Sequence, residues 1–319
     1  MESIRIGSFN LYKFSSDAGN ERLEAIANII KSSQVDILAV QEVFTKKSLD
    51  NLLMYLGSNW KRKWDTPNSR SVSAAEGYGF LWNEQNVTLS SNRSGKVFEP
   101  TIHEQYPHKN FGSLIRDPFY GRFVLKRNEM CEIRLINTHI MFSQNRSVNE
   151  SDDHDSSIEY VGDVTQRKRE FEILASKILP KLDDKAYDRQ WGEVDGICRK
   201  PITILLGDYN LNLRGSGAKD TFLDDNLAYI MIQDGNSVKE IITVQDQLTT
   251  LRAKDKETQK IEGYRNNFDH FTYDKTRPIE TKCWVIDAPR DPLFYNGDFD
   301  EYKKKVSDHL MIVMEVSFV

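Results

Sequence analysis

Short polar tags rich in carboxylate, amide and imidazole side chains recur along the chain, each where an apolar run of strand length begins or ends. They are SFN from Ser8, QE from Gln41, EGYGFLW from Glu76, RDPFYGRF from Arg116, NTHI from Asn137, GDYN from Gly207, NFDHF from Asn267 and SDH from Ser307. Ligands of open α/β sheets bind at strand ends, so polar residues repeated there can converge on one site. The tags therefore predict a single polar site assembled from many segments.

Carboxylates that directly follow an apolar run are candidate ligands of a hard cation. Glu42 and Asp208 stand in such places, and a charged group after a buried strand needs a partner, a metal or open solvent. Mg²⁺ prefers one or two carboxylates together with waters and phosphate oxygens. Taken alone, Glu42 is explained equally well as a solvated carboxylate, and an isolated Asp-His dipeptide such as Asp308-His309 is more often incidental than catalytic.

The elements that must position these tags follow an α/β pattern. Apolar residues after Asn20 recur at intervals of three and four, which predicts a helix, and a longer helix is predicted over Val164–Leu182. A strand, a helix and a strand in succession open an α/β layer fold. The apolar runs predicted as strands are Ile4–Phe9, Val35–Val40, Tyr78–Trp82, Gly121–Lys126, Glu132–Ile140, Ile202–Leu206, Lys282–Ile286 and Leu310–Phe318. The stretch 289–305 is expected as a loop.

Taken in order, the tags resemble the endonuclease/exonuclease/phosphatase superfamily, which has the fold of deoxyribonuclease I. GDYN is similar to its GD[FLW]N, SDH to its closing SDH, and NTH to its T/L-H strand end, while QE stands where its first metal carboxylate stands. The resemblance implies a four-layer α/β sandwich, with two mainly antiparallel sheets packed face to face and flanked by helices. A site that needs both Asn10 and His309 implies one domain over 1–319, with a mobile loop at 143–162.

The resemblance also implies which side chains handle the metal and the attacking water. Asp208 and Asn210 match the pair that aligns the water and the phosphate oxygens, and either Asp208 or His309 takes the proton. The metal, Mg²⁺ or Mn²⁺, would be held by Asn10, Glu42 and Asp308, the last either directly or through a water.

A second group of matched residues would contact the phosphate. His309 is implied as general base or electrostatic partner, oriented by Asp269, because a carboxylate fixes the tautomer of an imidazole and raises its basicity. Arg116 matches a phosphate-contacting arginine, and a guanidinium suits bidentate recognition of phosphate; a surface ion pair with Asp117 is the alternative reading. The second histidine of the nuclease branch and its paired carboxylate are matched by His139 and Glu76.

Composition limits the partners and the compartment. The net charge of −5 argues against a uniformly basic surface that coats nucleic acid, although it leaves room for a local basic groove. No apolar run approaches the roughly 20 residues of a membrane span. The three cysteines form no C-x-x-C pattern, which indicates a reducing compartment without a thiolate zinc site, and the N-terminus lacks the features of a signal peptide. A cytoplasmic protein is expected.

The leading function is a divalent-metal-dependent phosphodiesterase, an endonuclease on DNA or RNA. The alternatives are a phosphatase or phospholipid phosphodiesterase of the same superfamily, or a nucleic-acid-binding module that has lost the chemistry. The signature patterns of inositol polyphosphate 5-phosphatases are absent, and His270 replaces the arginine that follows Asp269 in some branches. The basic, aromatic stretch NWKRKW from Asn59 is either a solvated loop or a contact for a nucleic-acid backbone. Tyr78 is expected in the core.

Overall fold

The fold is described from a computed structural model of the protein. Its described residues are 2–67, 76–92, 94–103, 114–142, 164–184, 193–194, 197–198, 201–214, 225–234 and 237–318. The loop expected at 143–162 lies outside these residues. Within the described part of the chain, no helix is both long enough and apolar enough to cross a membrane.

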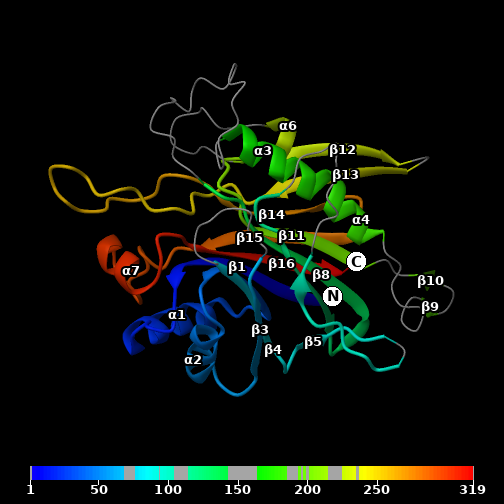
Figure 1. The fold of residues 1–319 in the computed structure, drawn as a ribbon, viewed down its shortest axis with the longest axis horizontal. Coiled ribbons are helices and arrows are strands. Elements are labelled where there is room, and N and C mark those ends of the chain that lie inside the picture. The colour runs from blue at the N-terminus through cyan, green and yellow to red at the C-terminus, as the bar shows by residue number, and fades with distance from the viewer. Residues whose placement is uncertain are drawn as a thin grey trace.

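Two β-sheets pack face to face, and helices cover their outer faces in four layers (Figure 1). Each sheet has one parallel pair, β1 with β2 and β8 with β11, and its other pairs are antiparallel. The first sheet has the order β15 (Ile279–Ile286), β16 (Met311–Phe318), β1 (Ser3–Phe14), β2 (Ile37–Val43), β4 (Gly77–Asn83) and β3 (Trp60–Asp65). This arrangement confirms the expected sandwich.

The second sheet has eight strands and lies above the first in Figure 1. Its order is β12 (Tyr229–Asp234), β13 (Ser237–Val244), β14 (Asp269–Asp274), β11 (Ile202–Asp208), β8 (Asn128–His139), β7 (Phe119–Leu125) and β5 (Val87–Leu89), with β6 (Thr101–Ile102) paired to β7. A separate short ladder joins β9 (Glu193–Val194) to β10 (Ile197–Cys198).

The helices bury apolar stripes against the two sheets. α1 (Asn20–Ser33) and α2 (Lys46–Leu56) pack on the six-stranded sheet. On the other side, α3 (Val164–Ile173), a π-helical segment η1 (Leu174–Ile178) and α4 (Leu179–Asp183) follow one another without a break, which confirms the helix expected there. The short helices α6 (Asp225–Ala228) and α7 (Phe299–Lys305) lie in connections.

The central core lies between the sheets. Successive side chains of a strand point alternately into this core and away from it. Ile4 and Ile6 of β1 point into this core, and so do Ile204 and Leu206 of β11. Two residues further along the same strands, at one end of the sandwich, this alternation turns polar side chains inward. The residues placed in this way are Ser8 and Asn10 on β1, Asn137 and His139 on β8, Asp208 on β11, Asp269 on β14 and Glu76 just before β4.

Three sequence expectations about local structure are wrong. β1 continues to Phe14 instead of ending before Asn10, because Tyr12 and Lys13 form a bulge with φ of 45° and 51°. The basic stretch after Asn59 is no loop but the edge strand β3, which pairs with β4. The stretch 289–305, expected as a loop, contains α7, whose first turn is capped by the Asp298 carboxylate.

Candidate active site

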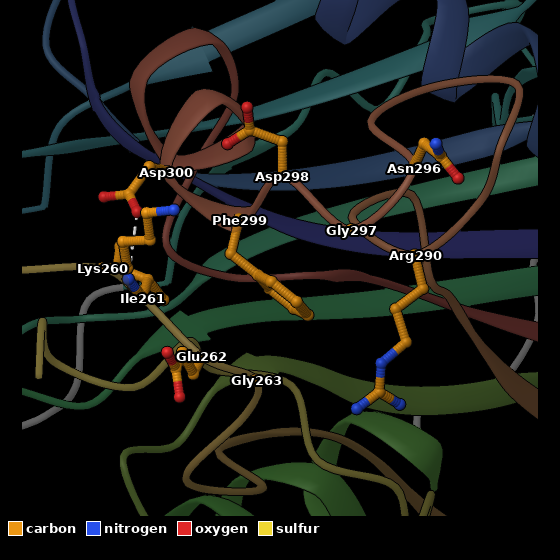
Figure 2. A pocket seen from close by; sticks show the side chains of 10 residues that line it. All are labelled: Lys260, Ile261, Glu262, Gly263, Arg290, Asn296, Gly297, Asp298, Phe299 and Asp300. Atoms are coloured by element: carbon orange, nitrogen blue, oxygen red, sulfur yellow. Dashed lines mark hydrogen bonds between the residues drawn. The ribbon is translucent and has the colours of Figure 1, made fainter. Parts of the chain in front are cut away.

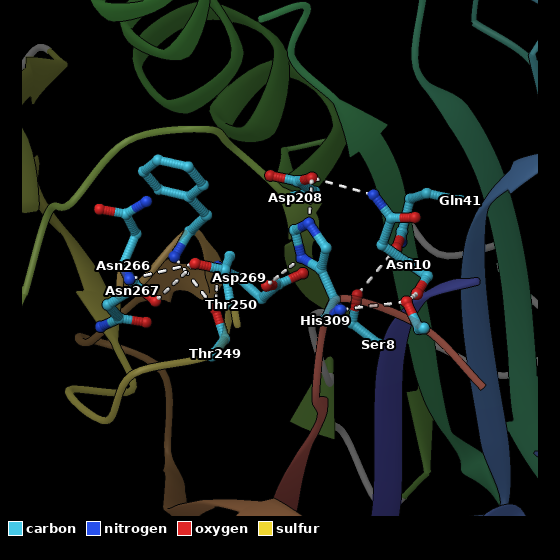
Figure 3. Close-up of polar contacts among 12 residues, drawn as sticks. Ser8, Asn10, Gln41, Asp208, Thr249, Thr250, Asn266, Asn267, Asp269 and His309 are labelled. Atoms are coloured by element: carbon cyan, nitrogen blue, oxygen red, sulfur yellow. Dashed lines mark hydrogen bonds and ion pairs between the residues drawn. The ribbon is translucent and has the colours of Figure 1, made fainter. Parts of the chain in front are cut away.

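Oδ2 of Asp208 lies at the centre of the polar cluster between the sheets. It accepts a hydrogen bond of 3.0 Å from Nδ2 of Asn10 and lies 3.5 Å from Nε2 of His309 and 3.6 Å from Nε2 of His139. Figure 3 shows the side chains of Asn10, on β1, and His309, in the segment just before β16, directed at this carboxylate. The Asp208 side chain is 2% exposed, so its charge depends on these neighbours instead of on water.

Glu42 reaches the same cluster through an unusual backbone conformation. Strand alternation would turn it away from the core, but its φ of 57° and an irregular register between β2 and β4 redirect the side chain. Nδ2 of Asn10 donates to Glu42 Oε1 at 3.1 Å, and the main-chain N–H of Lys13 donates to Oε2 at 2.8 Å. The amide of Asn10 therefore bridges the Glu42 and Asp208 carboxylates.

Gly207 and Asn210 shape the loop that carries Asp208. Gly207 has φ of 141°, and a Cβ there would lie 1.9 Å from the carbonyl oxygen of Thr138, so the GDYN turn requires glycine. Asn210 has φ of 51°; its N–H donates to Asp208 Oδ1 at 2.9 Å and its amide donates to the Ile140 carbonyl at 2.8 Å. Asn210 thus holds the carboxylate of Asp208 in place.

His309 and Asp269 form a buried pair next to Asp208. Their Nδ1 and Oδ2 atoms lie 2.8 Å apart, and the Asp269 side chain is fully buried (Figure 3). Burial alone would lower the pKa of His309, but the negative charges of Asp269 and Asp208 outweigh it and raise this pKa well above the usual value. Burial raises the pKa of Asp208, and the His309 charge opposes that rise.

His139, Glu76 and Arg116 form a second row of charge on the other side of Asp208. Nη2 of Arg116 forms an ion pair with Glu76 Oε2 at 2.7 Å, and its Nη1 lies 3.0 Å from Nδ1 of His139, which is itself 3.4 Å from Glu76 Oε2. Burial would raise the pKa of Glu76, but its hydrogen bond to His139 and the charges of His139 and Arg116 hold it below the ordinary value. Arg116 thus forms its ion pair with Glu76. Tyr78 is buried as expected, and its hydroxyl accepts from the His139 N–H.

The surroundings of the Glu42 carboxylate suit the binding of a hard divalent cation. Within the described residues, the hydrogen bonds to its carboxylate come from neutral groups, the Asn10 amide and the Lys13 N–H, so its charge has no directly bonded cation. Carboxylate oxygens are ligands that Mg²⁺ accepts. Asn10 presents Nδ2 to Glu42 while its Oδ1 accepts from the Tyr12 N–H, so it would ligate a metal through Oδ1 after its amide turns over. Asp208, Asp269 and His309 form a second candidate group, because one potential ligand atom of each lies within 4.8 Å of the other two. Nδ1 of His309, however, is already bonded to Asp269.

Asp308 stands apart from the carboxylates bridged by Asn10. Its Oδ2 atom lies 3.5 Å from Nζ of Lys303 on α7, and its main-chain carbonyl accepts from the Leu251 N–H. Its charge adds to the rise in the pKa of His309, so it lies near the site without touching Asp208 in this arrangement. Of the three expected metal ligands, the structure brings Asn10 and Glu42 together and leaves Asp308 paired with a lysine.

The sequence reasoning did not identify Arg22, which supports the site from α1. Its Nη2 atom donates to the carbonyls of Leu11, Tyr12 and Val306, and so ties the end of β1 to the segment before His309. Arg22 precedes Ile26 and Ile30 at intervals of four, so it lies in the apolar stripe of its helix. The sequence feature that could have identified Arg22 is an arginine within the apolar stripe of a predicted helix.

Other supporting residues also escaped notice. Oγ1 of Thr249 accepts from the main-chain N–H groups of Phe268 and Asp269, and Oγ of Ser307 donates to the Asn10 carbonyl. Such single hydroxyls have no distinctive spacing in the sequence.

The basic residues of β3 are matched by acidic neighbours, which argues against a nucleic-acid contact there, one of the two alternatives left open by the sequence. Lys61 pairs with Glu84 at 3.5 Å, and Lys63 with Glu99 at 3.2 Å. Arg62 pairs with Asp50. The strand therefore presents little net charge.

A cavity of 740 Å³ lies beside α7, and Glu262, Asp298 and Asp300 are among the residues that line it (Figure 2). Arg290 and Phe299 line it, and the Arg290 guanidinium lies 6.0 Å from the Phe299 ring centroid. None of the expected site residues lines this cavity. We therefore assign the chemistry to the cluster around Asp208.

Comparisons with known proteins agree on one family. The structure of an endonuclease/exonuclease/phosphatase from Bacteroides vulgatus superposes with a TM-score of 0.56 at 11% identity, over 100% of both chains. D. rerio TDP2 complexed with a single-strand DNA product gives 0.53 at 13% identity, covering 99% of this chain and 100% of that one. A mannosyl-6-phosphatase from Bacteroides thetaiotaomicron gives 0.50 at 13% identity, covering 99% of this chain and 100% of that one.

At such low identity these structures establish the fold alone. No curated protein sequence matches the chain. A sequence model of the Endonuclease/Exonuclease/phosphatase family, however, matches residues 7–309, which include the tags from Ser8 to His309. The chain therefore belongs to the Endonuclease/Exonuclease/phosphatase family, whose members act on phosphate esters.

Proposed function

We propose that the protein is a divalent-metal-dependent phosphodiesterase that acts as an endonuclease on DNA or RNA. The observation that carries this proposal is the surrounding of Asp208 Oδ2 by Asn10, His309 and His139, with Glu42 bridged to the same amide. Burying so many closely spaced carboxylate, amide and imidazole groups costs free energy unless they are matched to one another, to a metal or to a ligand. A pure binding module has no need of them.

In the proposed site, the metal and the cationic side chains hold the phosphate. Glu42 and Asn10 would bind Mg²⁺ or Mn²⁺, with Asp308 reaching it after release from Lys303, and the metal would polarise a non-bridging phosphate oxygen. Arg116 and His139 face the same space from the opposite side and would bind the other phosphate oxygens. The phosphate is thereby oriented between two rows of charge.

The proton steps are assigned from the charge states of the buried groups. Because Asp269 and Asp208 raise the pKa of His309, they favour the charged imidazolium, which would donate a hydrogen bond to the phosphate. Asp208, held by the Asn210 N–H, would orient the attacking water and accept its proton. Asp269 acts through His309 as a positioning residue.

The substrate class is the finer part of the proposal. A polynucleotide is favoured because a structural neighbour, D. rerio TDP2, was crystallised with a single-strand DNA product. A phosphatase is the second candidate, because another neighbour of the same fold is a mannosyl-6-phosphatase. Both reactions need the same metal and phosphate contacts and differ in what surrounds the phosphate.

The test is turnover of a substrate panel by the purified protein. Plasmid, single-stranded DNA, RNA, a phosphodiester chromogen and sugar phosphates are each incubated with Mg²⁺, Mn²⁺ or EDTA. We expect internal cleavage of at least one polynucleotide that EDTA abolishes. Release of inorganic phosphate from the sugar phosphates alone would establish the phosphatase instead, and tight DNA binding without turnover of any ester would refute the enzyme.

A further inference from the structure

The ring of Tyr12 brings two lysine ammonium groups together at the rim of the site. Nζ of Lys13, at the end of β1, lies 5.4 Å from the ring centroid, and Nζ of Lys303, on α7, lies 5.5 Å from it. Each ammonium group is attracted to the electron-rich ring, and Lys303 also lies 3.5 Å from Oδ2 of Asp308. The fold thus brings two cationic side chains, from segments that are remote in the sequence, to the same aromatic ring.

The backbone that presents this group is strained and clamped. Tyr12 and Lys13 both have left-handed conformations, with φ of 45° and 51°, which are unfavourable for residues that carry a side chain. The guanidinium of Arg22 donates to the carbonyls of Tyr12 and of Val306, the residue just after α7. One partly buried side chain therefore fixes both segments that supply the lysines.

The group directly adjoins the proposed metal ligands. The Tyr12 N–H donates to Oδ1 of Asn10 at 2.9 Å, and the Lys13 N–H donates to Oε2 of Glu42 at 2.8 Å. The Lys13 charge also helps to lower the pKa of Glu76. Lys303 in turn pairs with Asp308, the residue before His309. Both lysines therefore adjoin residues of the proposed site.

We propose that Tyr12, Lys13 and Lys303 form a subsite for a second phosphate group of the substrate, next to the one that is cleaved. This inference rests on the proposed function, because it presumes that a phosphate ester occupies the centre around Asp208. Lysine binds phosphate as a point charge, and two flexible lysine side chains beside one ring can both reach the same anion. The second phosphate is either the neighbouring phosphodiester of a polynucleotide or another phosphate on a small molecule.

The test compares substrates that differ by one phosphate. Thymidylyl-thymidine is measured against the same dinucleotide carrying a 5′- or a 3′-terminal phosphate, and glucose 6-phosphate against glucose 1,6-bisphosphate. The quantity is the ratio of kcat/KM with and without the extra phosphate, for wild type, Lys13→Gln, Lys303→Gln and the double variant. Lys304→Gln is the matched control, because it removes the same charge from an exposed place on the same helix.

We expect the wild type to prefer the substrate with the extra phosphate, and each single variant to reduce that ratio about fivefold. The double variant should reduce it by about 20-fold, and Lys304→Gln should keep the wild-type ratio. Tyr12→Leu should reduce the ratio, while Tyr12→Phe, which keeps the ring, should not. If Lys303 only neutralises Asp308, its loss changes all substrates alike and leaves the ratio as it was.

Calorimetry in EDTA measures Kd for the same substrate pairs. The ratio of Kd with and without the extra phosphate then tests the subsite even if the protein turns over none of these substrates. If the lysine variants reduce the ratio for the dinucleotides, the subsite is supported and the second phosphate belongs to a polynucleotide. If they reduce it for the glucose phosphates, the second phosphate belongs to a small molecule. Ratios equal to wild type in every lysine variant, in both kcat/KM and Kd, would overturn the subsite whatever the outcome for the proposed function. Lysine-dependent Kd ratios without turnover would refute the function and keep the subsite.

Discussion

Asn10 and Asp208 join the two sheets through a hydrogen bond of 3.0 Å between residues 198 positions apart. Asn10 lies on β1 of the six-stranded sheet and Asp208 ends β11 of the eight-stranded sheet. Both side chains are almost completely buried, and the same amide also reaches Glu42. The site is therefore an interface between the sheets, so its geometry and the stability of the sandwich depend on each other.

Asn10→Ala should lower the free energy of unfolding. The variant removes the donor shared by two carboxylates and leaves Asp208 buried with fewer partners, which typically costs about 1–3 kcal/mol. Urea denaturation at pH 7 in EDTA measures the loss. Asn28→Ala, at an exposed position of α1, serves as the control. Equal stability of Asn10→Ala and wild type would contradict the bridging role.

Glu42→Gln should abolish metal binding while the fold persists. The amide has nearly the shape of the carboxylate but lacks the charge that a hard cation requires. Mn²⁺ should raise the Tm of the wild type, and that rise should disappear in the variant together with metal-dependent cleavage. Glu84→Gln, which changes the ion pair with Lys61 on the surface, should keep both responses. A variant that still binds Mn²⁺ with wild-type affinity would remove Glu42 from the proposed metal site.

Much of the cluster around Asp208 follows from local rules that a sequence can express. Asn10, His139 and Asp208 each continue the alternation that turns the apolar residues of their strands into the core. The order of the tags also predicted the sandwich. What brings these strand ends together is the packing of one sheet on the other, which is not a local property and came from the family resemblance.

The features that escaped prediction depend on backbone conformations or on remote partners. Glu42 reaches the site only because its φ is 57°, and the bulge at Tyr12 and Lys13 extends β1 beyond the predicted end. A left-handed residue other than glycine leaves no clear sequence signal. The basic stretch of β3 looked like a binding surface because its partners, such as Glu99 for Lys63, are distant in the sequence.

Replacing Lys61 and Lys63 together by Gln should leave nucleic-acid binding unchanged. Both lysines form partly exposed ion pairs, which contribute little to stability and cancel their charge toward a polyanion. The slope of log Kd for a single-stranded oligonucleotide against log salt concentration should equal that of the wild type. A slope reduced by about 0.7 for each lysine would show that they contact phosphates after all.

Glu170 should make the stability of the protein depend on pH. This glutamate of α3 is 3% exposed and accepts from the Ile115 N–H, and burial raises its pKa to about 7 from 4.5. The native state then binds a proton more tightly than the unfolded chain, so the contribution is fully present below about pH 4.5 and is lost as the pH rises toward 7. The shift corresponds to about 3 kcal/mol.

Glu170→Gln isolates this contribution, because the amide mimics the protonated carboxyl and still accepts from Ile115. Urea denaturation should give equal stability for the variant and wild type near pH 5, and a more stable variant near pH 8. Glu172→Gln, at an exposed position of the same helix, should follow the wild type at both pH values. Parallel pH profiles for Glu170→Gln and wild type would show that the carboxyl ionises without penalty.

His309 and Asp269 should behave as one functional unit in a double-mutant cycle. His309→Ala removes the imidazolium that faces Asp208, and loss of such a group typically lowers kcat by about 10²- to 10⁴-fold. KM should change little, because Arg116 and the metal would still hold the phosphate. Asp269→Asn keeps the size of the side chain but weakens the 2.8 Å contact that orients the ring, so it should lower kcat in the same direction. If Asp269 acts only through His309, adding Asp269→Asn to His309→Ala costs little more, whereas multiplicative losses would mean that the two residues act independently.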